Sequence, residues 1–297
     1  MSKRRVVITG LGMVSPVGLD VKSSWENILA GKSGVKRISH FDVSGFTSQI
    51  GGSISKDFDS SNVIKPKDAK KMDTFIQYGI VAADEALKDS GLEVTDENAE
   101  RIGVAIGSGI GGLGIIEKNY DIILKKGPRK VSPFLIPATI INMVSGHVSI
   151  RHGMKGPNIA LVTACATATH SIGDAARIIE YGDADVMIAG GAEMATSPTG
   201  LGGFASARAL SSRNDDPETA SRPWDKDRDG FVMGEGSGTL ILEEYEHAVN
   251  RGAEIYGEII GVGLTADAYH LTAPSPQGDG ARRSMEEAIK DGGIEPN

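Results

Sequence analysis

The sequence predicts an α/β protein in which helices cover a mainly parallel sheet. Short, continuously apolar runs such as 186–189 alternate with longer segments whose apolar residues recur at helical spacing. Strands that are buried on both faces read as uninterrupted apolar runs, as parallel strands in α/β proteins do. A chain of 297 residues exceeds the usual size of one domain, so it should bury a large core in one unit or two.

Capping residues mark where two helices in the first half of the chain begin or end. Asp20 is placed to cap a helix over 21–29, and Gly91 ends an amphipathic helix that begins near residue 72. Residues 32–71, between these helices, are polar and irregular, which predicts an excursion on the surface. The other elements expected before residue 165 are strands at 6–8, 102–106 and 159–162, and helices at 115–124 and 140–151.

The second half continues the alternation. A helix from about residue 166 to Gly182 leads into the strand at 186–189, which predicts a β-α-β unit. The elements expected after it are a strand at 240–242, a helix at 244–250 and a strand at 255–262.

One segment recurs in the chain. The run EALKDSGL at 85–92 returns as EAIKDGGI at 287–294, and both copies close a helix. Lys, Asp and Gly are common at helix ends, so the two segments could resemble each other by chance. The alternative is that the chain contains a duplicated half.

Composition limits the possible partners and the compartment. The net charge of −8 argues against general binding to nucleic acid or membrane, because phosphate surfaces repel it. No run approaches the roughly 18 apolar residues of a membrane span. A single cysteine excludes an intramolecular disulfide and an all-cysteine metal site, which fits a reducing cytoplasm.

That cysteine, Cys165, lies between the predicted strand at 159–162 and the helix that follows. A thiol at the start of a helix is near the positive end of the helix dipole and near unpaired N–H groups, which favour the nucleophilic thiolate. The alternative is a small buried residue, the commoner role of a lone cysteine. Thr163 and Thr167 stand where the hydrolase motif G-x-S-x-G has glycine, so a hydrolase is a distant second possibility.

Two further motifs have ordinary explanations. The run GSGIGG at 107–112 satisfies G-x-G-x-x-G between a strand and a helix, but no acidic residue follows at the spacing of a dinucleotide site. A loop that lets backbone or substrate approach closely is the alternative. Residues 225–230 copy half of a calcium loop, yet Gly236 occupies the twelfth position where a glutamate is needed, so calcium is rejected and charge pairing within a turn is expected.

The histidines do not cluster at ligand spacing. His170 is about 140° around the helix from Cys165, which makes it a poor base for the thiol. His152 and His247 are expected at solvated helix positions, and His147 is a candidate core residue. His270 remains a candidate pocket residue on a loop.

Three segments together identify a family. The runs VTACATA at 162–168, GDADVMIAGGAE at 182–193 and RPWDKDRDGFVMGEG at 222–236 resemble the β-ketoacyl-acyl-carrier-protein synthase II family of bacterial fatty-acid synthesis. The resemblance runs from Val6 to Ile294. It implies the thiolase fold, with two similar halves stacked as α-β-α-β-α layers. Residues 1–254 would form the N-terminal ketosynthase half, and 255–297 the first strand and helix of an incomplete C-terminal half.

The resemblance also implies an activity. Cys165 would accept an acyl chain from acyl carrier protein as a thioester, and the carbanion from malonyl-carrier protein would then attack it, giving a chain two carbons longer. The backbone N–H of Cys165 would be one oxyanion donor. No cofactor and no metal ligand are implied.

Other positions take family roles by the same resemblance. Ile110 and Phe204 would line the acyl pocket, with Ile110 influencing chain length. His270 and Thr272 would lie near the pantetheine arm, and Phe134 would reach toward the other subunit of a homodimer. Acyl carrier protein is acidic, and the residues that resemble a basic patch for it are Lys67, Lys70, Lys71, Arg129, Lys130 and Arg208.

The chain departs from the family in one respect. The two catalytic histidines that promote decarboxylation, a lysine and the second oxyanion donor belong to the family's C-terminal half, and this sequence contains none of them. The 297 residues are therefore expected to be a fragment that does not condense alone. The buried face of its sheet is also expected to lack a partner.

Two other functions fit parts of the sequence. A non-catalytic partner subunit that binds carrier protein or sets chain length is one, although such partners lack the nucleophile that Cys165 provides. Thiolase-like acyl transfer with coenzyme A is the other. The sequence around Cys165 and Phe231 favours the carrier-protein enzymes instead.

Overall fold

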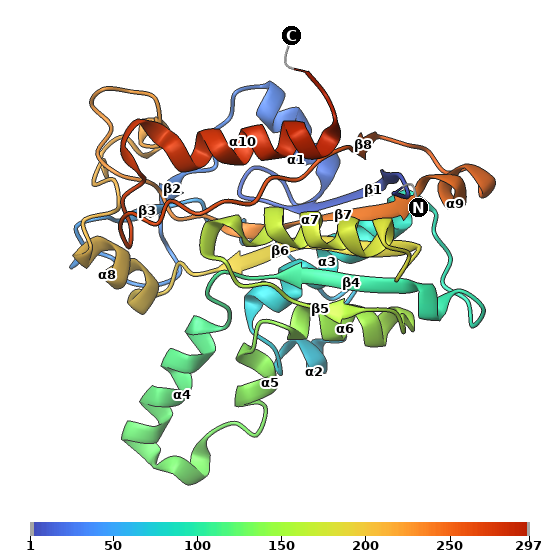
Figure 1. Cartoon of the computed structure of the whole chain (residues 1–297). Coiled ribbons are helices and arrows are strands. Elements are labelled where there is room, and N and C mark those ends of the chain that lie inside the picture. Colours follow the sequence, from blue (N-terminus) through green and yellow to red (C-terminus); the bar gives the residue numbers. More distant parts are fainter. Residues whose placement is uncertain (1–2, 296–297) are drawn as a thin grey trace.

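The computed structural model describes residues 3–295, and its centre is one six-stranded sheet with helices on both faces (Figure 1). The strands lie in the order β5-β4-β6-β7-β1-β8. Their bounds are β1 Val6–Val14, β4 Ile102–Gly107, β5 Asn158–Ile159, β6 Val186–Met194, β7 Glu235–Glu244 and β8 Gly257–Ile259.

The predicted helices are found close to their expected ranges. The helices are α1 Val21–Leu29, α2 Pro66–Ala69, α3 Thr74–Ser90, α4 Leu113–Lys126, α5 Leu135–Thr139, α6 Met143–His152, α7 Thr167–Glu180, α8 Pro198–Ser206, α9 Tyr245–Asn250 and α10 Asp279–Gly292. Of these, α2, α5 and α8 are three short helices that were not predicted. The caps explain two of these boundaries. The Asp20 side chain accepts a hydrogen bond from the Ser23 N–H at the start of α1, and Gly91 takes a left-handed conformation after α3.

The sheet is mixed, so the prediction of a mainly parallel sheet is wrong. Strand β4 is parallel to β5 and β6, but β7 is antiparallel to both β6 and β1, and β8 is antiparallel to β1. Met194, at the end of β6, is paired with Glu235, at the start of β7. The connection 195–234 therefore returns to the edge it left, without the crossover helix that a parallel pair requires.

Most strands differ in length from their predicted ranges. Strands β6 and β7 are longer than the predicted 186–189 and 240–242, and β8 is shorter than the predicted 255–262. Strand β1 continues through two glycines to Val14, because glycine there gives α3 room to lie against the strand. Strand β5 is Asn158–Ile159, so only Ile159 of the predicted 159–162 belongs to it. The chain leaves the sheet after Ile159 and enters the turn that carries Cys165.

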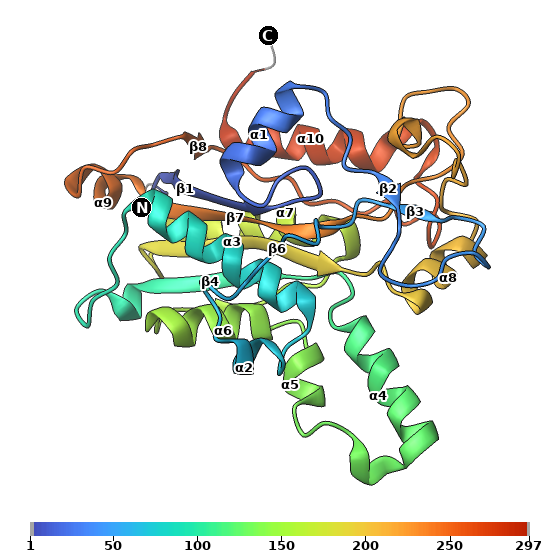
Figure 2. The ribbon, with the colours of Figure 1, turned by 180° about the vertical axis from the view of Figure 1, so that it is seen from behind.

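The helices form a layer on each face of the sheet. Helices α3 and α6 cover one face, seen in front in Figure 2, and α7 covers the other, seen in front in Figure 1. Phe75 and Ile76 of α3 and Ile179 of α7 are fully buried against the strands. Both faces of the sheet are thus covered, which explains the continuous apolar runs. The expectation that the buried face lacks a partner is therefore wrong, because α7 of this chain lies on it.

The contact between β1 and α3 is unusually close. A Cβ atom added to Gly12 would lie 1.9 Å from the Ala82 carbonyl oxygen, so only glycine fits there. One residue earlier, the Leu11 N–H donates to the Asp89 carboxylate at 2.9 Å. The Met13 N–H donates likewise to the Glu85 carboxylate at 2.8 Å, so strand and helix are held together by backbone contact and by two carboxylates.

The segment before α10 repeats this arrangement. A Cβ added to Gly263 would lie 1.9 Å from the Ser284 carbonyl oxygen, and the Val262 N–H donates to the Asp291 carboxylate at 3.0 Å. Ser284 and Asp291 are separated by the same seven positions as the equivalent pair in α3. The sequence echo therefore marks two equivalent helices, which favours duplication over chance.

The same segment supplies further layers. The Val262 side chain contacts Gly173 of α7, while its glycine neighbours at 261 and 263 lie against α10. Residues 261–263 consequently lie between α7 and α10. The order is α3, sheet, α7, extended segment, α10, which is the α-β-α-β-α stacking expected from the sequence.

The excursion at 32–71 is less superficial than predicted. It contains a two-stranded sheet, β2 Lys36–Arg37 with β3 Ile50–Gly51, and helix α2. Ile38, Val43 and Ile50 are buried, because part of the excursion packs on the 195–234 connection. Its polar composition describes only its outer side.

A buried ion-pair cluster joins β1, β7 and α9. The side chain of Glu243 is fully buried and accepts hydrogen bonds from Arg251 Nε and Nη2, both at 2.7 Å, from His247 Nδ1 at 2.5 Å and from Thr9 Oγ1 at 2.7 Å. Burial alone would raise the pKa of Glu243, but the bonds from Arg251, His247 and Thr9 outweigh it and lower the pKa to about 2.

The expectation that His247 and His152 are solvated is therefore wrong. His247 is paired with Glu243. His152 is half-buried, with its Nε2 3.8 Å from the Asp84 carboxylate, and burial lowers its pKa. The sequence shows helix positions but not which neighbouring element covers them.

We expect Glu243→Ala to lower the free energy of unfolding by about 3 kcal/mol, because the partly buried Arg251 and His247 would lose their common partner. Urea denaturation at neutral pH measures this. The matched control is Glu258→Ala, which breaks an exposed pair with Arg5 and should cost about 0–1 kcal/mol. Equal losses in the two variants would contradict the assignment.

The pH dependence has a defined sign. The folded-state pKa of Glu243 lies below its ordinary value of 4.5. Its contribution is therefore complete above about pH 4.5 and is lost as the pH falls through about 2. Glu243→Gln should remove this part of the acid sensitivity.

Candidate active site

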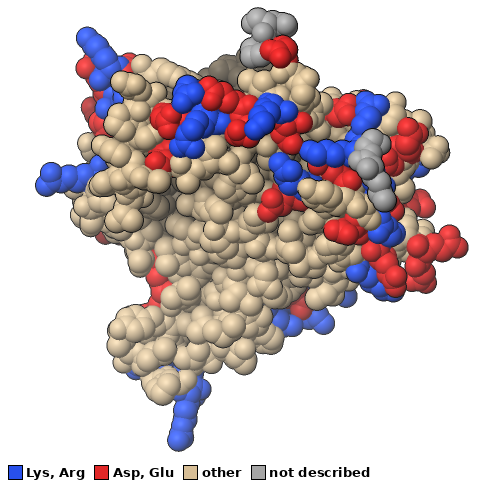
Figure 3. All heavy atoms as spheres, in the orientation of Figure 1, with Lys and Arg blue, Asp and Glu red and all other residues tan. Residues whose placement is uncertain are grey.

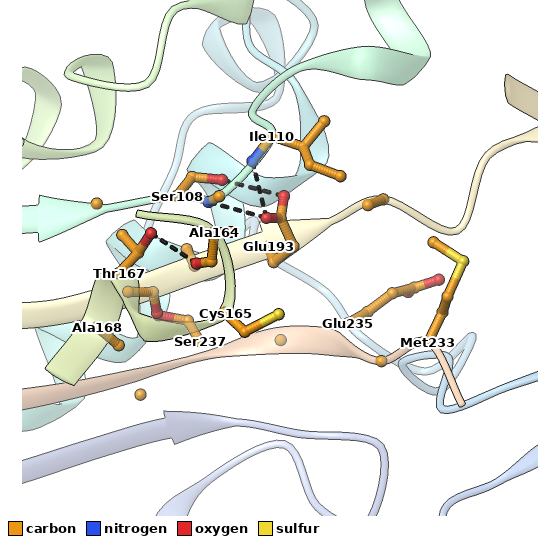
Figure 4. Close-up of a pocket in the computed structure, with 18 of the residues that line it drawn as sticks. Ser108, Ile110, Ala164, Cys165, Thr167, Ala168, Glu193, Met233, Glu235 and Ser237 are labelled. Carbon is orange, nitrogen blue, oxygen red and sulfur yellow. Dashed lines mark hydrogen bonds between the residues drawn. The ribbon is translucent and has the colours of Figure 1, made fainter. Parts of the chain in front are cut away.

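Four strand ends meet at one edge of the sheet and line a cavity of about 540 Å³ (Figure 4). The carboxyl ends of β4, β6 and β1 supply Gly107, Glu193 and Met13, and the amino end of β7 supplies Ser237. Ligand sites in α/β proteins form at such edges, because loops diverge there and leave a crevice. The strand order thus places the site.

The cavity is mostly apolar. Ile110, Phe204, Phe231 and Met233 are among its lining residues, and the rings of Phe204 and Phe231 are in edge-to-face contact with centroids 5.4 Å apart. An elongated apolar ligand such as an acyl chain suits these walls.

Cys165 lies on the wall of this cavity and is exposed, so it is not a core cysteine. It occupies a single 3-10 turn, Ala164–Ala166, directly before α7. Ala164 has φ +51°, a left-handed conformation that costs a non-glycine residue roughly 1–2 kcal/mol. The Thr167 hydroxyl stabilises the turn, since it donates to the Ala164 carbonyl at 2.7 Å and accepts from the Thr163 N–H at 2.8 Å.

Small residues bring the start of α7 against the sheet. A Cβ added to Gly107 would lie 2.4 Å from Thr167 Cγ2, and one added to Gly191 would lie 2.9 Å from Ala168 Cβ. The amino end of α7, with the positive end of its dipole, is therefore held beside the thiol.

His170 is bonded to the segment that leads into the cysteine turn. Its Nδ1 is 2.7 Å from the hydroxyl of Thr163. That His170 is a poor base for Cys165 stays a prediction from helical geometry.

The glycine loop at 107–112 wraps around a carboxylate. Glu193 Oε2 accepts from the N–H groups of Gly109 at 2.9 Å and Ile110 at 3.0 Å, and its Oε1 accepts from the Ser108 hydroxyl at 3.0 Å (Figure 4). These N–H groups are the donors that a nucleotide phosphate would need. The glycines therefore serve close backbone approach, the alternative that the sequence left open.

Glu193 was not among the predicted site residues. Burial raises the pKa of Glu193, while its hydrogen bonds from Ser108 and the loop act in the opposite direction. An acidic residue at the carboxyl end of a buried apolar strand was the available signal.

The predicted site residues divide into two groups. Cys165, Ile110 and Phe204 line the same cavity. Phe134 lies at the start of α5, with Lys71 Nζ 5.3 Å from its ring centroid.

His270 and Thr272 belong to an exposed loop and are not among the residues that line this cavity. His270 Nδ1 accepts from the Thr272 N–H at 3.1 Å.

The predicted basic patch is divided among three elements. Lys67, Lys70 and Lys71 lie on and just after α2. Arg129 and Lys130 lie in the 3-10 turn Pro128–Lys130 at the tip of the arm formed by α4 and α5 (Figure 1), and Arg208 follows α8.

The segment that copies half of a calcium loop uses its carboxylates within the chain. Asp225 Oδ1 accepts from the Asp227 N–H, and Asp229 accepts from the Ser212 N–H. Arg228 donates to the Asp225 carbonyl oxygen rather than to a carboxylate. Within residues 3–295, no group of three or more His, Cys, Asp or Glu side chains has the geometry to hold a metal ion.

No helix in the described part of the chain is both long and apolar enough to cross a membrane.

A thiol at a helix start, beside an apolar cavity in stacked α-β-α-β-α layers, defines a thiolase-fold protein with a cysteine centre. The sequence model described as "Beta-ketoacyl synthase, N-terminal domain" matches residues 3–248. The chain belongs to the β-ketoacyl synthase family.

Individual relatives agree. The chain is 60% identical over 294 residues to a 3-oxoacyl-[acyl-carrier-protein] synthase 2 from Vibrio cholerae, covering 99% of this chain and 71% of the relative. A Coxiella burnetii protein of the same name is 58% identical over 296 residues, again with 71% of its length covered.

A solved structure of a type II polyketide acyl carrier protein in complex with its ketosynthase superposes with a TM-score of 0.88 at 34% identity, covering 99% of this chain and 71% of that one.

Proposed function

We propose that the protein acts in fatty-acid elongation, accepting an acyl chain from acyl carrier protein on Cys165 for decarboxylative condensation with malonyl-carrier protein. The observation that carries the proposal is the position of Cys165, exposed at the start of α7 on the wall of an apolar cavity. An acyl chain that is transferred to a thiol needs apolar walls for its hydrocarbon part and an exposed thiol beside its carbonyl carbon. The cavity and Cys165 provide both. The relatives named 3-oxoacyl-[acyl-carrier-protein] synthase 2 support the same reaction.

The first step is acyl transfer. The Cys165 thiolate attacks the thioester carbonyl, the oxyanion is stabilised by the Cys165 backbone N–H at the helix start, and the pantetheine thiolate leaves and takes up a proton. Malonyl-carrier protein then loses carbon dioxide, and its carbanion attacks the acyl carbon. A new C–C bond forms as the C–S bond to Cys165 breaks. In these reaction steps, the chain supplies the acyl acceptor Cys165 and the cavity for the acyl chain.

Further roles are assigned by position. Ile110 and Phe204 contact the acyl chain, since both line the cavity with Cys165. His270 and Thr272 are proposed near the pantetheine arm, and Phe134 near a second subunit. The proposed division of the chain falls between residues 254 and 255, just before β8 begins the second copy of the strand and helix arrangement.

The exposure of Cys165 favours an enzyme over a non-catalytic partner subunit. A chain-length partner needs no thiol in its cavity, whereas this thiol is exposed on the cavity wall. The cytoplasm is the proposed compartment, because a free exposed cysteine suits a reducing environment.

Incubation with acyl carrier protein that carries saturated chains should add one acyl group to the protein, seen by intact mass. Cys165→Ala should reduce this adduct by at least about 10³-fold, because the nucleophile is removed. Peptide mapping should place the acyl group on Cys165. An adduct that persists in Cys165→Ala, or no adduct with any chain length, would sink the assignment of the nucleophile.

The carrier protein is proposed to dock on the basic residues Lys67, Lys70, Lys71, Arg129, Lys130 and Arg208. These positions lie on α2, on the arm and after α8, so they can contact separate parts of an acidic partner. Charges at the rim of an interface act mainly on the association rate and on its salt dependence.

The double variant Lys67→Glu with Lys70→Glu should slow acylation from carrier protein about tenfold at low salt and flatten the salt dependence. Intact-mass measurements on samples quenched at several times, over a series of salt concentrations, give the acylation rate and its salt dependence. Lys22→Glu on α1 is the matched control and should leave the rate unchanged. If the control slows the reaction as much as the double variant, net charge rather than a docking patch is responsible.

A homodimer is proposed through the free edge of the sheet at β5. Residues 159–173 contain no Lys, Arg, Asp or Glu, and Val162 is 55% exposed there. Figure 3 shows charged side chains gathered over α10 and a broad uncharged face below them. An unpaired strand edge beside an uncharged face is typical of a surface that another chain covers.

Val162→Glu should shift the protein toward the monomer in size-exclusion chromatography with light scattering, because a buried charge at the interface is costly. Trp25→Glu, at an exposed apolar position on α1, should leave the mass unchanged. A monomeric unsubstituted protein would overturn the homodimer.

A further inference from the structure

The glycine loop is held by one side chain. Of the residues that line the cavity, Glu193 alone binds three consecutive positions of the loop: Ser108 through its hydroxyl, and Gly109 and Ile110 through their N–H groups. Ser108 Oγ in turn accepts from the Gly111 N–H at 3.1 Å. Four successive residues therefore depend on one carboxylate, directly or through the serine.

The loop also lies close to the turn that carries Cys165. A Cβ added to Gly109 would lie 2.9 Å from Glu193 Oε2 and 3.1 Å from the Ala164 carbonyl oxygen. The Glu193 carboxylate and the turn that carries Cys165 both lie close to Gly109, where glycine leaves room for them. The glycine loop, Glu193 and the cysteine turn are thus packed against one another.

Ile110 is the residue whose place this arrangement decides. Its N–H is bonded to Glu193, and its side chain lines the cavity (Figure 4). A main-chain shift at this position would move the side chain and change the space between Cys165 and the wall.

Both carboxylate oxygens accept hydrogen bonds from the loop. Oε2 faces two N–H donors and Oε1 faces a hydroxyl. No lysine or arginine forms an ion pair with Glu193 in the described residues. A carboxylate that is occupied in this way positions a loop and does not act as a base for the thiol.

We propose that Glu193 is the positioning residue that fixes the glycine loop, so that Ile110 forms a rigid wall and limits the length of chain the cavity accepts. The limit on acyl chains rests on the proposed function. The anchoring of the loop does not, because it follows from contacts within the chain.

The test uses the full 297-residue chain and two readouts that need no carrier protein. Alkylation of Cys165 by N-ethylmaleimide and N-dodecylmaleimide measures how well a long chain is accommodated relative to a short one. Amide hydrogen exchange of the peptide that contains 107–112 measures the loop directly.

In Glu193→Ala, the dodecyl-to-ethyl rate ratio should rise about fivefold or more, and exchange in 107–112 should speed up about tenfold, because the loop loses its acceptors. Glu193→Gln should stay within about twofold of the unsubstituted protein. Its amide oxygen can accept both N–H groups, and its amide nitrogen can donate to Ser108 Oγ. Rescue by glutamine separates hydrogen bonding from charge.

Two more variants guard against a general loss of structure. Ser108→Ala removes the Oε1 partner and the Gly111 acceptor, and should change both readouts in the same direction by less. Asp84→Asn disturbs a buried carboxylate between α3 and α6 that binds Lys88 and Arg151, and should leave the rate ratio unchanged.

The outcomes separate the two proposals. An unchanged ratio with unchanged exchange in Glu193→Ala, or an equal fall of both maleimide rates, overturns the positioning role and leaves the acyl acceptor untouched. A shifted ratio in a protein that forms no adduct with acyl-carrier protein supports the positioning role and overturns the acyl function.

Discussion

Close approach of helix backbone to strand backbone is the constraint on which the structure depends. A Cβ at Gly12 would lie 1.9 Å from a carbonyl oxygen of α3, and one at Gly263 would lie equally close to α10. The start of α7 is seated in the same way over Gly107 and Gly191. Glycine at these positions allows the layers to approach, and the approach fixes where each helix begins relative to the strand ends.

The chemistry follows from that placement. The first turn of α7 meets the carboxyl ends of β4 and β6, so the thiol of Cys165 lies at the edge where the strands diverge into a cavity. The strained conformation of Ala164 persists because Thr167 bonds both sides of the turn. A nucleophile on such a turn is presented to a ligand without rearrangement.

Carboxylates are used in two ways in this protein. Glu243 is fully buried, but two cationic side chains keep it ionised. Glu193 has no cation beside it among residues 3–295, and main-chain N–H groups with one hydroxyl take that place. The first arrangement ties together elements of the core, and the second shapes a loop. Each explains why an acidic residue occurs within an otherwise apolar strand.

Much of the fold was predictable from local signals. The caps at Asp20 and Gly91 place two helices to within two residues, because a cap satisfies the helix end regardless of tertiary contacts. The direction of β7 was not predictable, since an apolar run reports burial and is the same for parallel and antiparallel neighbours. The repeat at 85–92 and 287–294 was visible, but its meaning required the matching contacts to α3 and α10.

The sequence by itself determined the family, the nucleophile candidate Cys165 and the cavity residues Ile110 and Phe204, because these depend on residue type at fixed positions in recognisable motifs. Only the tertiary structure decided that Glu193 holds the glycine loop and that Glu243 binds Thr9. These partners are separated by 83 to 85 and by 234 positions. Contacts over such distances are set by which strands become neighbours in the sheet, and no local pattern encodes that order.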